Sequence, residues 1–335
     1  LQPNVAEAMP QVSYRDAEGN ELPADAPVSS IAETVYEIRI RPGIRYQPHP
    51  AFAVDAAGRP RYADLDEASL GDRSQIGDFE YTGTRELDAA DFAYQIKRLV
   101  RPRIESPGLA IFSQIVSLED LAARLREEVD AGRLNPDGWI DMRRFPLEGV
   151  ETPDPHTLRI RIRGKYPQFL NWLATTFVVP VPWEAERFYA QPGMARRELT
   201  LDMWPVGTGP FMMERNQPLR EIRLVRNPEY RRDLYPCEGE PGDAEAGLLA
   251  DCGKPLPLVD GFRFSYEKEA TPFWNKFLQG YYDIYASTRF ATFTGFDTAL
   301  QLQGGALSLS PAMERQGIRL RTEVEPAIEY FFVNM

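Results

Sequence analysis

Histidine and cysteine are scarce in this sequence, with two residues of each among 335. A serine nucleophile needs a neighbouring base, most often histidine, and both His49 and His156 stand beside proline in polar stretches. A closed zinc site needs further Cys or His ligands, which Cys237 and Cys252 lack nearby. We therefore expect no catalytic residue, no metal site and no cofactor, and so a protein that is not an enzyme.

Long apolar runs and an excess of positive charge are missing as well. No run reaches the roughly 18 apolar residues of a transmembrane helix, and the segment from Leu1 lacks the basic start and apolar stretch of a signal peptide. The 38 basic and 50 acidic residues give a net charge of −12 at pH 7. A charge of this sign repels phosphate backbones and anionic lipids, so we expect neither nucleic-acid binding nor membrane insertion.

The two cysteines that are present share one stretch, Tyr235 to Pro257, which is rich in Gly, Pro, Asp and Glu. This composition is typical of a loop. A bond between Cys237 and Cys252 would close about 15 residues and stabilise the fold by about 3 kcal/mol in an oxidising compartment. We expect this disulfide, and two free thiols are the alternative.

Alternating apolar and charged residues predict several strands. Residues 36–41 and 158–163 each place apolar side chains on one face and charged side chains on the other. Shorter runs of this kind lie at 222–225, 262–266 and 318–321. Residues 328–333 are almost continuously apolar, which is typical of a central strand covered on both faces.

Helical periodicity with capping residues predicts helices between these strands. One begins after Asp88, whose carboxylate can cap the amide of Asp91, and ends before Pro102. Another begins after Ser117 and ends at Gly132. Helix and strand signals alternate without an internal repeat, so the predicted fold class is α/β.

Three long polar stretches, residues 47–85, 133–155 and 231–259, have little periodicity and are predicted to be surface insertions. A boundary is expected at residues 164–167, where a strand ends and an apolar helix begins.

Aromatic residues accumulate in the last quarter of the chain. A third predicted helix places Phe273, Phe277 and Tyr281 at four-residue spacing, a stripe that belongs more often to a core than to a binding site. Tyr285 and Tyr330 each combine an apolar ring with a polar tip, which suits a concave ligand site.

Short motifs follow one another along almost the whole chain. They are Asn4–Met9, Tyr36–Tyr46, Leu87–Arg98, Asp154–Ile160, Pro167–Leu170 and Val179–Pro182. The most specific pair is Pro205-Val-Gly-Thr-Gly-Pro-Phe211 followed by Val225-Arg-Asn-Pro-Glu-Tyr230. In this order they resemble the extracellular solute-binding proteins of ABC importers, family 5, the dipeptide, oligopeptide and nickel class. The insertion at residues 47–85 and the cysteine-bearing loop depart from the family pattern.

The resemblance implies a periplasmic-binding-protein-like fold of two lobes that close around a ligand, with an accessory subdomain. It implies that residues 1–165 form the accessory subdomain of the first lobe and residues 166–335 form its ligand-facing part, up to the hinge crossing. It further implies an incomplete chain that lacks a short segment before Leu1 and most of the second lobe.

The resemblance also implies a function. The protein would capture a small ligand, above all a dipeptide or oligopeptide, and deliver it to an ABC permease in the inner membrane. It would be a monomer in the periplasm, or extracellular and lipid-anchored in a Gram-positive host. The Gly280–Ile284 string resembles a family string that leads toward the cleft, so Tyr285 is an expected ligand-binding residue. Tyr330 and Phe331 stand on the predicted strand that crosses toward the second lobe, so they are the other expected ligand-binding residues, and Tyr330 is favoured because its hydroxyl can hydrogen-bond a peptide. Nickel is the least favoured ligand, because both histidines stand in loops.

Two other functions stay open. A ligand-sensing receptor could reuse the same fold, and would continue into a signalling or DNA-binding segment. A hydrolase would convert its substrate, whereas a transport protein would bind and release its ligand unchanged.

Overall fold

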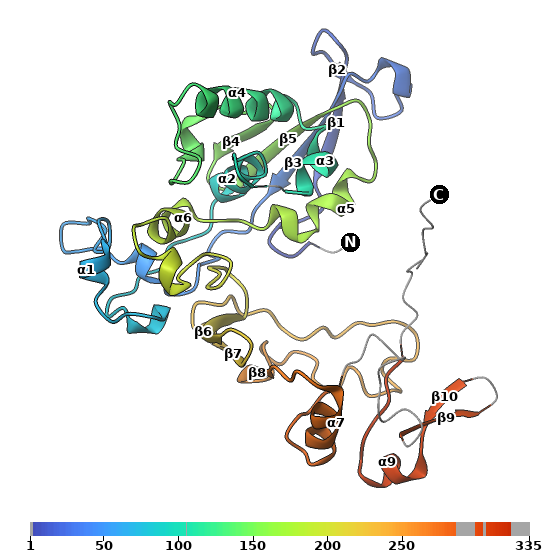
Figure 1. The fold of residues 1–335 in the computed structure, drawn as a ribbon. Helices are drawn as coiled ribbons and strands as arrows, with labels where there is room; N and C mark the ends of the chain where they lie inside the picture. The colour runs from blue at the N-terminus through green and yellow to red at the C-terminus, as the bar shows by residue number, and fades with distance from the viewer. Residues whose placement is uncertain (1–2, 105, 286–298, 304–305, 323–335) are drawn as a thin grey trace, which may run out of the picture. The chain divides into compact units, whose positions relative to one another are not determined.

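The computed structural model describes residues 3–104, 106–285, 299–303 and 306–322 (Figure 1). These residues mix helices and strands, so the predicted α/β class is confirmed. The chain divides into two units, residues 1–264 and residues 265–335. Within the described ranges, no helix is both long and apolar enough to cross a membrane.

The first unit contains an antiparallel sheet in the order β2-β1-β3-β5-β4 (Figure 1). Its strands are β1 (Gln11–Arg15), β2 (Glu21–Leu22), β3 (Glu33–Arg39), β4 (Val150–Asp154) and β5 (Thr157–Arg163). Tyr36 lies opposite Ile160 with both side chains buried, and Glu37 lies opposite Arg159 on the other face. The Arg159 guanidinium is 2.9 Å from the Glu37 carboxylate. The predicted alternation of apolar and charged faces is therefore confirmed.

Helices between the strands complete the core of this unit. They are α1 (Glu67–Leu70), α2 (Ala89–Arg98), α3 (Gly108–Phe112), α4 (Leu118–Asp130), α5 (Phe169–Leu173) and α6 (Trp183–Tyr189). Helix α2 packs against β4 and β5. The Asp88 carboxylate accepts a hydrogen bond of 3.2 Å from the Asp91 amide, which confirms the predicted cap. Ser117 precedes α4 as predicted, but its backbone is left-handed and its side chain caps nothing.

The stretch 47–85 contributes to the core, and its prediction as a surface insertion was wrong. His49 is 1% exposed and Leu70 is fully buried. The rings of His49 and Phe79 each lie 5.3 Å from the ring of Phe188 in α6. These buried residues stand beside prolines and glycines at irregular intervals, so they show no helix or strand period, although His49 and Phe79 converge on α6.

The predicted boundary at residues 164–167 falls between β5 and α5. Phe169 in α5 is fully buried and its ring lies 5.2 Å from that of Tyr36 in β3. Residues on the two sides of position 165 thus share one core within the first unit. The division into subdomains 1–165 and 166–335 stays a prediction.

A second sheet in the order β6-β7-β8 ends the first unit. Its strands are β6 (Phe211–Gln217), β7 (Glu221–Arg226) and β8 (Gly261–Ser265), so strands exist where residues 222–225 and 262–266 predicted them.

The described part of the second unit contains two helices, α7 (Ala270–Leu278) and α9 (Pro311–Arg315), and two strands that pair antiparallel, β9 (Leu300–Gln303) and β10 (Ala306–Leu309). The predicted strand at 318–321 is absent from this described segment. Instead, the Ile318 amide donates to the Met313 carbonyl (3.2 Å) and closes the end of α9. The predicted strand at 328–333 lies outside the described residues.

Candidate functional site

Helix α7 carries the aromatic residues Phe273, Trp274 and Phe277 and ends in a tight reversal. Gly280 has a φ of 79°. Its amide donates to the Phe277 carbonyl (2.9 Å), and the Tyr281 amide donates to the Lys276 carbonyl (3.0 Å). This pair of bonds is the Schellman motif, in which a left-handed residue favours glycine. The reversal brings the following residues back beside the helix.

Tyr285, one of the predicted ligand-binding residues, packs on α7 through this reversal. Its ring centroid lies 4.5 Å from Phe273, 5.2 Å from Trp274 and 5.8 Å from Phe277. Burial among these rings raises the pKa of the Tyr285 phenol. With Tyr282, whose ring meets Phe273 at 5.3 Å, these residues form what we call the aromatic cluster.

A carboxylate closes the edge of the aromatic cluster. Glu267 Oε1 accepts a hydrogen bond of 2.6 Å from the Tyr282 hydroxyl and a second one from the Lys276 ammonium group. These hydrogen bonds, that of Lys276 first, hold the pKa of the Glu267 carboxyl below its usual value. The same contact raises the pKa of Lys276. The two opposite charges therefore compensate each other beside the rings.

Sequence reasoning missed Glu267 and Lys276. Glu267 lies 9 residues before Lys276 and 15 before Tyr282, so no helical or strand period connects them. The available signal was a Schellman glycine after an aromatic helix, which predicts that the chain folds back on that helix.

Tyr281 is 72% exposed and Ile284 is 74% exposed. The predicted stripe is partly buried at Phe273 and Phe277, but it was wrong for Tyr281, because α7 ends at Leu278 and the helical period ends with it. The segment therefore offers apolar surface next to rings whose neighbouring charges are compensated. Such a surface can contact apolar and peptide groups of a ligand.

The other predicted ligand residues, Tyr330 and Phe331, lie outside the described residues and stay predictions. In the part of the chain that the structure describes, no three His, Cys, Asp or Glu side chains are grouped so that they could hold a metal ion.

The two most specific motifs meet within the first unit. Asn227 is 5% exposed, and its backbone amide donates to the Pro210 carbonyl while its side-chain amide donates to the Gly209 carbonyl, both at 2.9 Å. Gln47 approaches the same turn, because its backbone amide donates to the Gly207 carbonyl (2.9 Å) and its side chain accepts from the Gly207 amide (3.2 Å). These polar groups are satisfied by backbone, so they join chain segments and leave nothing for a ligand.

A shallow hollow in the first unit lies beside Pro50, Trp183 and Phe188 and has a volume of about 30 Å³. That volume holds about one or two water molecules. It is too small for a peptide.

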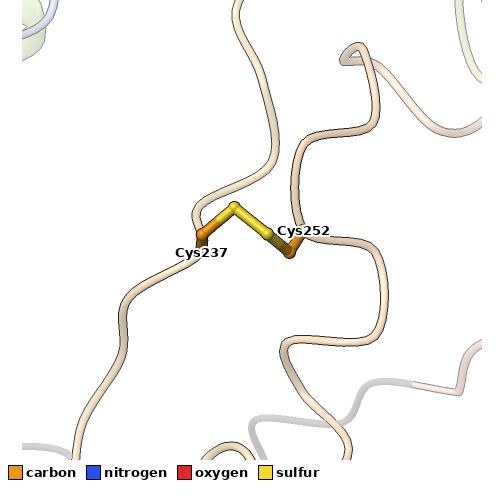
Figure 2. The surroundings of a disulfide bond; sticks show 2 residues. All are labelled: Cys237 and Cys252. Atoms are coloured by element: carbon orange, nitrogen blue, oxygen red, sulfur yellow. A yellow bond between two sulfur atoms is a disulfide. The ribbon is translucent and has the colours of Figure 1, made fainter.

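Cys237 and Cys252 are bonded in the structure, with Cα atoms 4.6 Å apart (Figure 2). Beside the bond, the Tyr235 amide donates to the Lys254 carbonyl (2.9 Å) and the Leu256 amide donates to the Asp233 carbonyl (2.8 Å). The two ends of the loop are therefore already held together by backbone. The redox state of these cysteines in the exported protein stays a prediction.

Residues 78–329, about three quarters of the chain, match the family described as bacterial extracellular solute-binding proteins, family 5 Middle. Proteins of Brucella ovis and Brucella abortus, named as ABC transporter peptide-binding proteins, are each 28% identical over 89 residues. That alignment covers 25% of this chain and 16% of each relative.

Several solved structures align with this chain at low identity. The pheromone receptor PrgZ aligns with a TM-score of 0.49 and 17% identity, over 90% of this chain and 41% of its own. An oligopeptide ABC transporter substrate-binding domain from Bacillus anthracis aligns with a TM-score of 0.44 and 16% identity, over 82% of this chain and 39% of its own. The chain thus spans well under half of the length of these proteins.

Proposed function

The chain belongs to the bacterial extracellular solute-binding proteins of family 5, and from this membership we propose that it captures a peptide and delivers it to an ABC permease. The observation that carries the proposal is the family match over residues 78–329, which includes parts of both units. The choice of a peptide is supported by the Brucella relatives, which are named as peptide-binding proteins.

In the proposed mechanism the chain binds its ligand without converting it. Residues 1–165 act as an accessory subdomain and residues 166–335 as the first ligand-facing lobe, and a second lobe closes over the ligand by rotation about a hinge. The protein works as a monomer in the periplasm, or lipid-anchored outside a Gram-positive cell.

Tyr285 is the described residue that we place at the ligand. Its ring is supported from behind by Phe273 and Phe277, and the charges next to the aromatic cluster are compensated by the contact of Glu267 with Lys276. A supported aromatic surface of this kind contacts a peptide through ring packing, and the Glu267–Lys276 pair adds no net charge to it.

The test begins with the complete natural protein, purified without added ligand and analysed by native mass spectrometry. A co-purifying peptide, displaced by excess synthetic peptide and recovered unchanged after prolonged incubation, is the expected result. Cleavage of that peptide would indicate a hydrolase, and a protein that binds no peptide would contradict the proposal.

The isolated 335-residue chain provides the matched comparison. If both lobes contact the ligand, this chain should bind the same peptide far more weakly than the complete protein in isothermal titration, because the closed state gains contacts from both sides. Equal affinities would place the whole site within these 335 residues and exclude the two-lobe cleft.

A further inference from the structure

Glu267 lies where three parts of the second unit meet. It precedes α7 in the chain, its carboxylate binds Lys276 within α7, and the same oxygen binds Tyr282 beyond the reversal at Gly280. One carboxylate oxygen thus connects the helix with the segment that folds back along it.

The contacts continue from this oxygen to Tyr285. The Tyr282 ring stands edge-on to Phe273 at 5.3 Å, and the Phe273 ring packs on Tyr285 at 4.5 Å. Tyr282 and Tyr285 lie on the same short segment, so a shift of one moves the other. An orientation set at Glu267 is therefore passed to the Tyr285 ring by direct contacts.

We propose that Glu267 is a positioning residue, which holds the Tyr285 ring against α7 and so sets the face that a bound peptide meets. The ligand part of this inference rests on the proposed function, whereas the orientation of Tyr285 can be measured without any ligand. Glu267 itself acts through Tyr282 and touches no ligand in this proposal.

The side chain at position 267 determines how firmly residues 281–285 are held against α7. A hydrogen bond to a charged acceptor is stronger than one to a neutral acceptor. Glu267→Ala removes both contacts, Glu267→Gln keeps an acceptor oxygen for the Tyr282 hydroxyl, and Tyr282→Phe removes only that hydroxyl. The three variants should therefore loosen the segment to different degrees, with Glu267→Ala the most severe.

Tyrosine nitration by tetranitromethane in the complete protein measures this loosening. Tyr281, 72% exposed, is an internal reference on the same segment, and mass spectrometry reports the ratio of Tyr285 to Tyr281 nitration. Glu267→Ala should raise that ratio by about three- to tenfold, on the scale of the net contribution of one hydrogen bond at a partly exposed site. Glu267→Gln and Tyr282→Phe should raise it less.

Glu269→Ala is the matched control, because Glu269 is an exposed glutamate two residues away whose side chain makes no capping hydrogen bond to α7. Its ratio should equal that of the wild type. An unchanged ratio in folded Glu267→Ala would overturn the inference. If that variant does not fold, an unchanged ratio in Tyr282→Phe would overturn it instead.

Isothermal titration with a pool of synthetic tripeptides tests the link to the ligand. Where the wild type binds, Glu267→Ala should weaken the affinity by about three- to tenfold, with partial recovery in Glu267→Gln and no change in Glu269→Ala. An unchanged affinity in Glu267→Ala would overturn the link between Glu267 and the ligand. A wild type that binds no member of the pool counts against the proposed function, while the nitration ratio still decides whether Glu267 positions Tyr285.

Discussion

The hydrogen bonds around His49 determine where its single ring proton lies. Nδ1 accepts from the Ala51 amide (3.1 Å), so the proton is on Nε2, which donates to the Tyr189 hydroxyl (2.8 Å). Tyr189 donates onward to the Trp204 carbonyl (2.7 Å). A second proton on the ring would remove the first of these bonds, and burial lowers the pKa of His49 from 6.5 to about 3.

Acidification should therefore destabilise the protein through His49. Below pH 6.5 the unfolded chain protonates this histidine while the folded chain does so only near pH 3, so stability present above pH 6.5 is lost progressively across this window. At pH 5, protonation of this histidine in the unfolded chain lowers the free energy of unfolding by about 2 kcal/mol. In urea unfolding, His49→Gln should lose about 2 kcal/mol less than the wild type between pH 7 and pH 5. Equal losses would contradict this assignment.

The second prediction about a single residue concerns Tyr330. If residues 328–333 form the predicted strand, neighbours point to opposite faces, so we expect only one of Tyr330 and Phe331 to face the ligand unless the strand is bulged or twisted there. In the complete protein, Tyr330→Ala should weaken peptide binding by about 1–3 kcal/mol, the scale of a buried hydrogen bond with its apolar contact. A loss below about 0.5 kcal/mol in titration, with an unchanged circular dichroism spectrum, would move the prediction to Phe331.

Among the elements, α2 and α6 are joined by a buried ion cluster. Glu186 Oε1 in α6 accepts from Arg98 (2.8 Å) and Arg101 (2.7 Å), and its other oxygen binds the Tyr94 hydroxyl. The Glu186 side chain is 5% exposed, so solvent screens these contacts little. Loss of the carboxylate would leave two poorly solvated guanidinium groups without their shared counter-charge.

Glu186→Ala should therefore lower the free energy of unfolding by about 3–5 kcal/mol, the cost of an uncompensated buried charge. Arg196→Ala is the control, because Arg196 pairs with Glu67 where both side chains are more than half exposed, and its loss should stay within about 1 kcal/mol. Urea unfolding measures both variants. A similar loss for the two would show that the α2–α6 cluster adds little.

Helices and strands could be predicted where a short-range sequence pattern agrees with the packing of the folded chain. The cap at Asp88 and the alternation in β3 and β5 are local patterns, and the structure keeps both. Burial of the stretch 47–85 depends on distant partners in α6, which no short-range pattern reports. The absence of a strand at Ile318 is also a tertiary outcome, since its apolar side chain packs against the small core of the second unit.

In the candidate site, too, some features follow from a local pattern and others depend on contacts between distant residues. The position of Tyr285 beside an aromatic helix follows from local sequence, and its contact with a ligand stays a prediction, whereas Glu267 was hidden in a polar loop. Its role arises from a contact between residues 15 positions apart, which depends on how tightly the chain reverses at Gly280.

At the scale of the whole molecule, the disulfide predicts the state of the cysteines in protein exported to an oxidising compartment. Protein exported to an oxidising compartment should show no free thiol when denatured without reductant, because Cys237 and Cys252 are bonded. Reduction should lower the free energy of unfolding by about 3 kcal/mol in the loop-entropy model. A variant with both cysteines replaced by alanine should not respond to reductant, and two reactive thiols in the exported wild type would contradict the prediction.

The hydrogen bonds that connect Asn227 with Gly209 and Pro210 have a consequence for how proteins of this family are classified. Its amide groups bind backbone carbonyls of the preceding motif, and Gln47 binds the same turn. These hydrogen bonds hold segments of the chain together, so the two strings describe the scaffold and not a ligand. Sharing both strings therefore says nothing about the ligand of a protein, so a ligand has to be assigned from positions elsewhere in the chain.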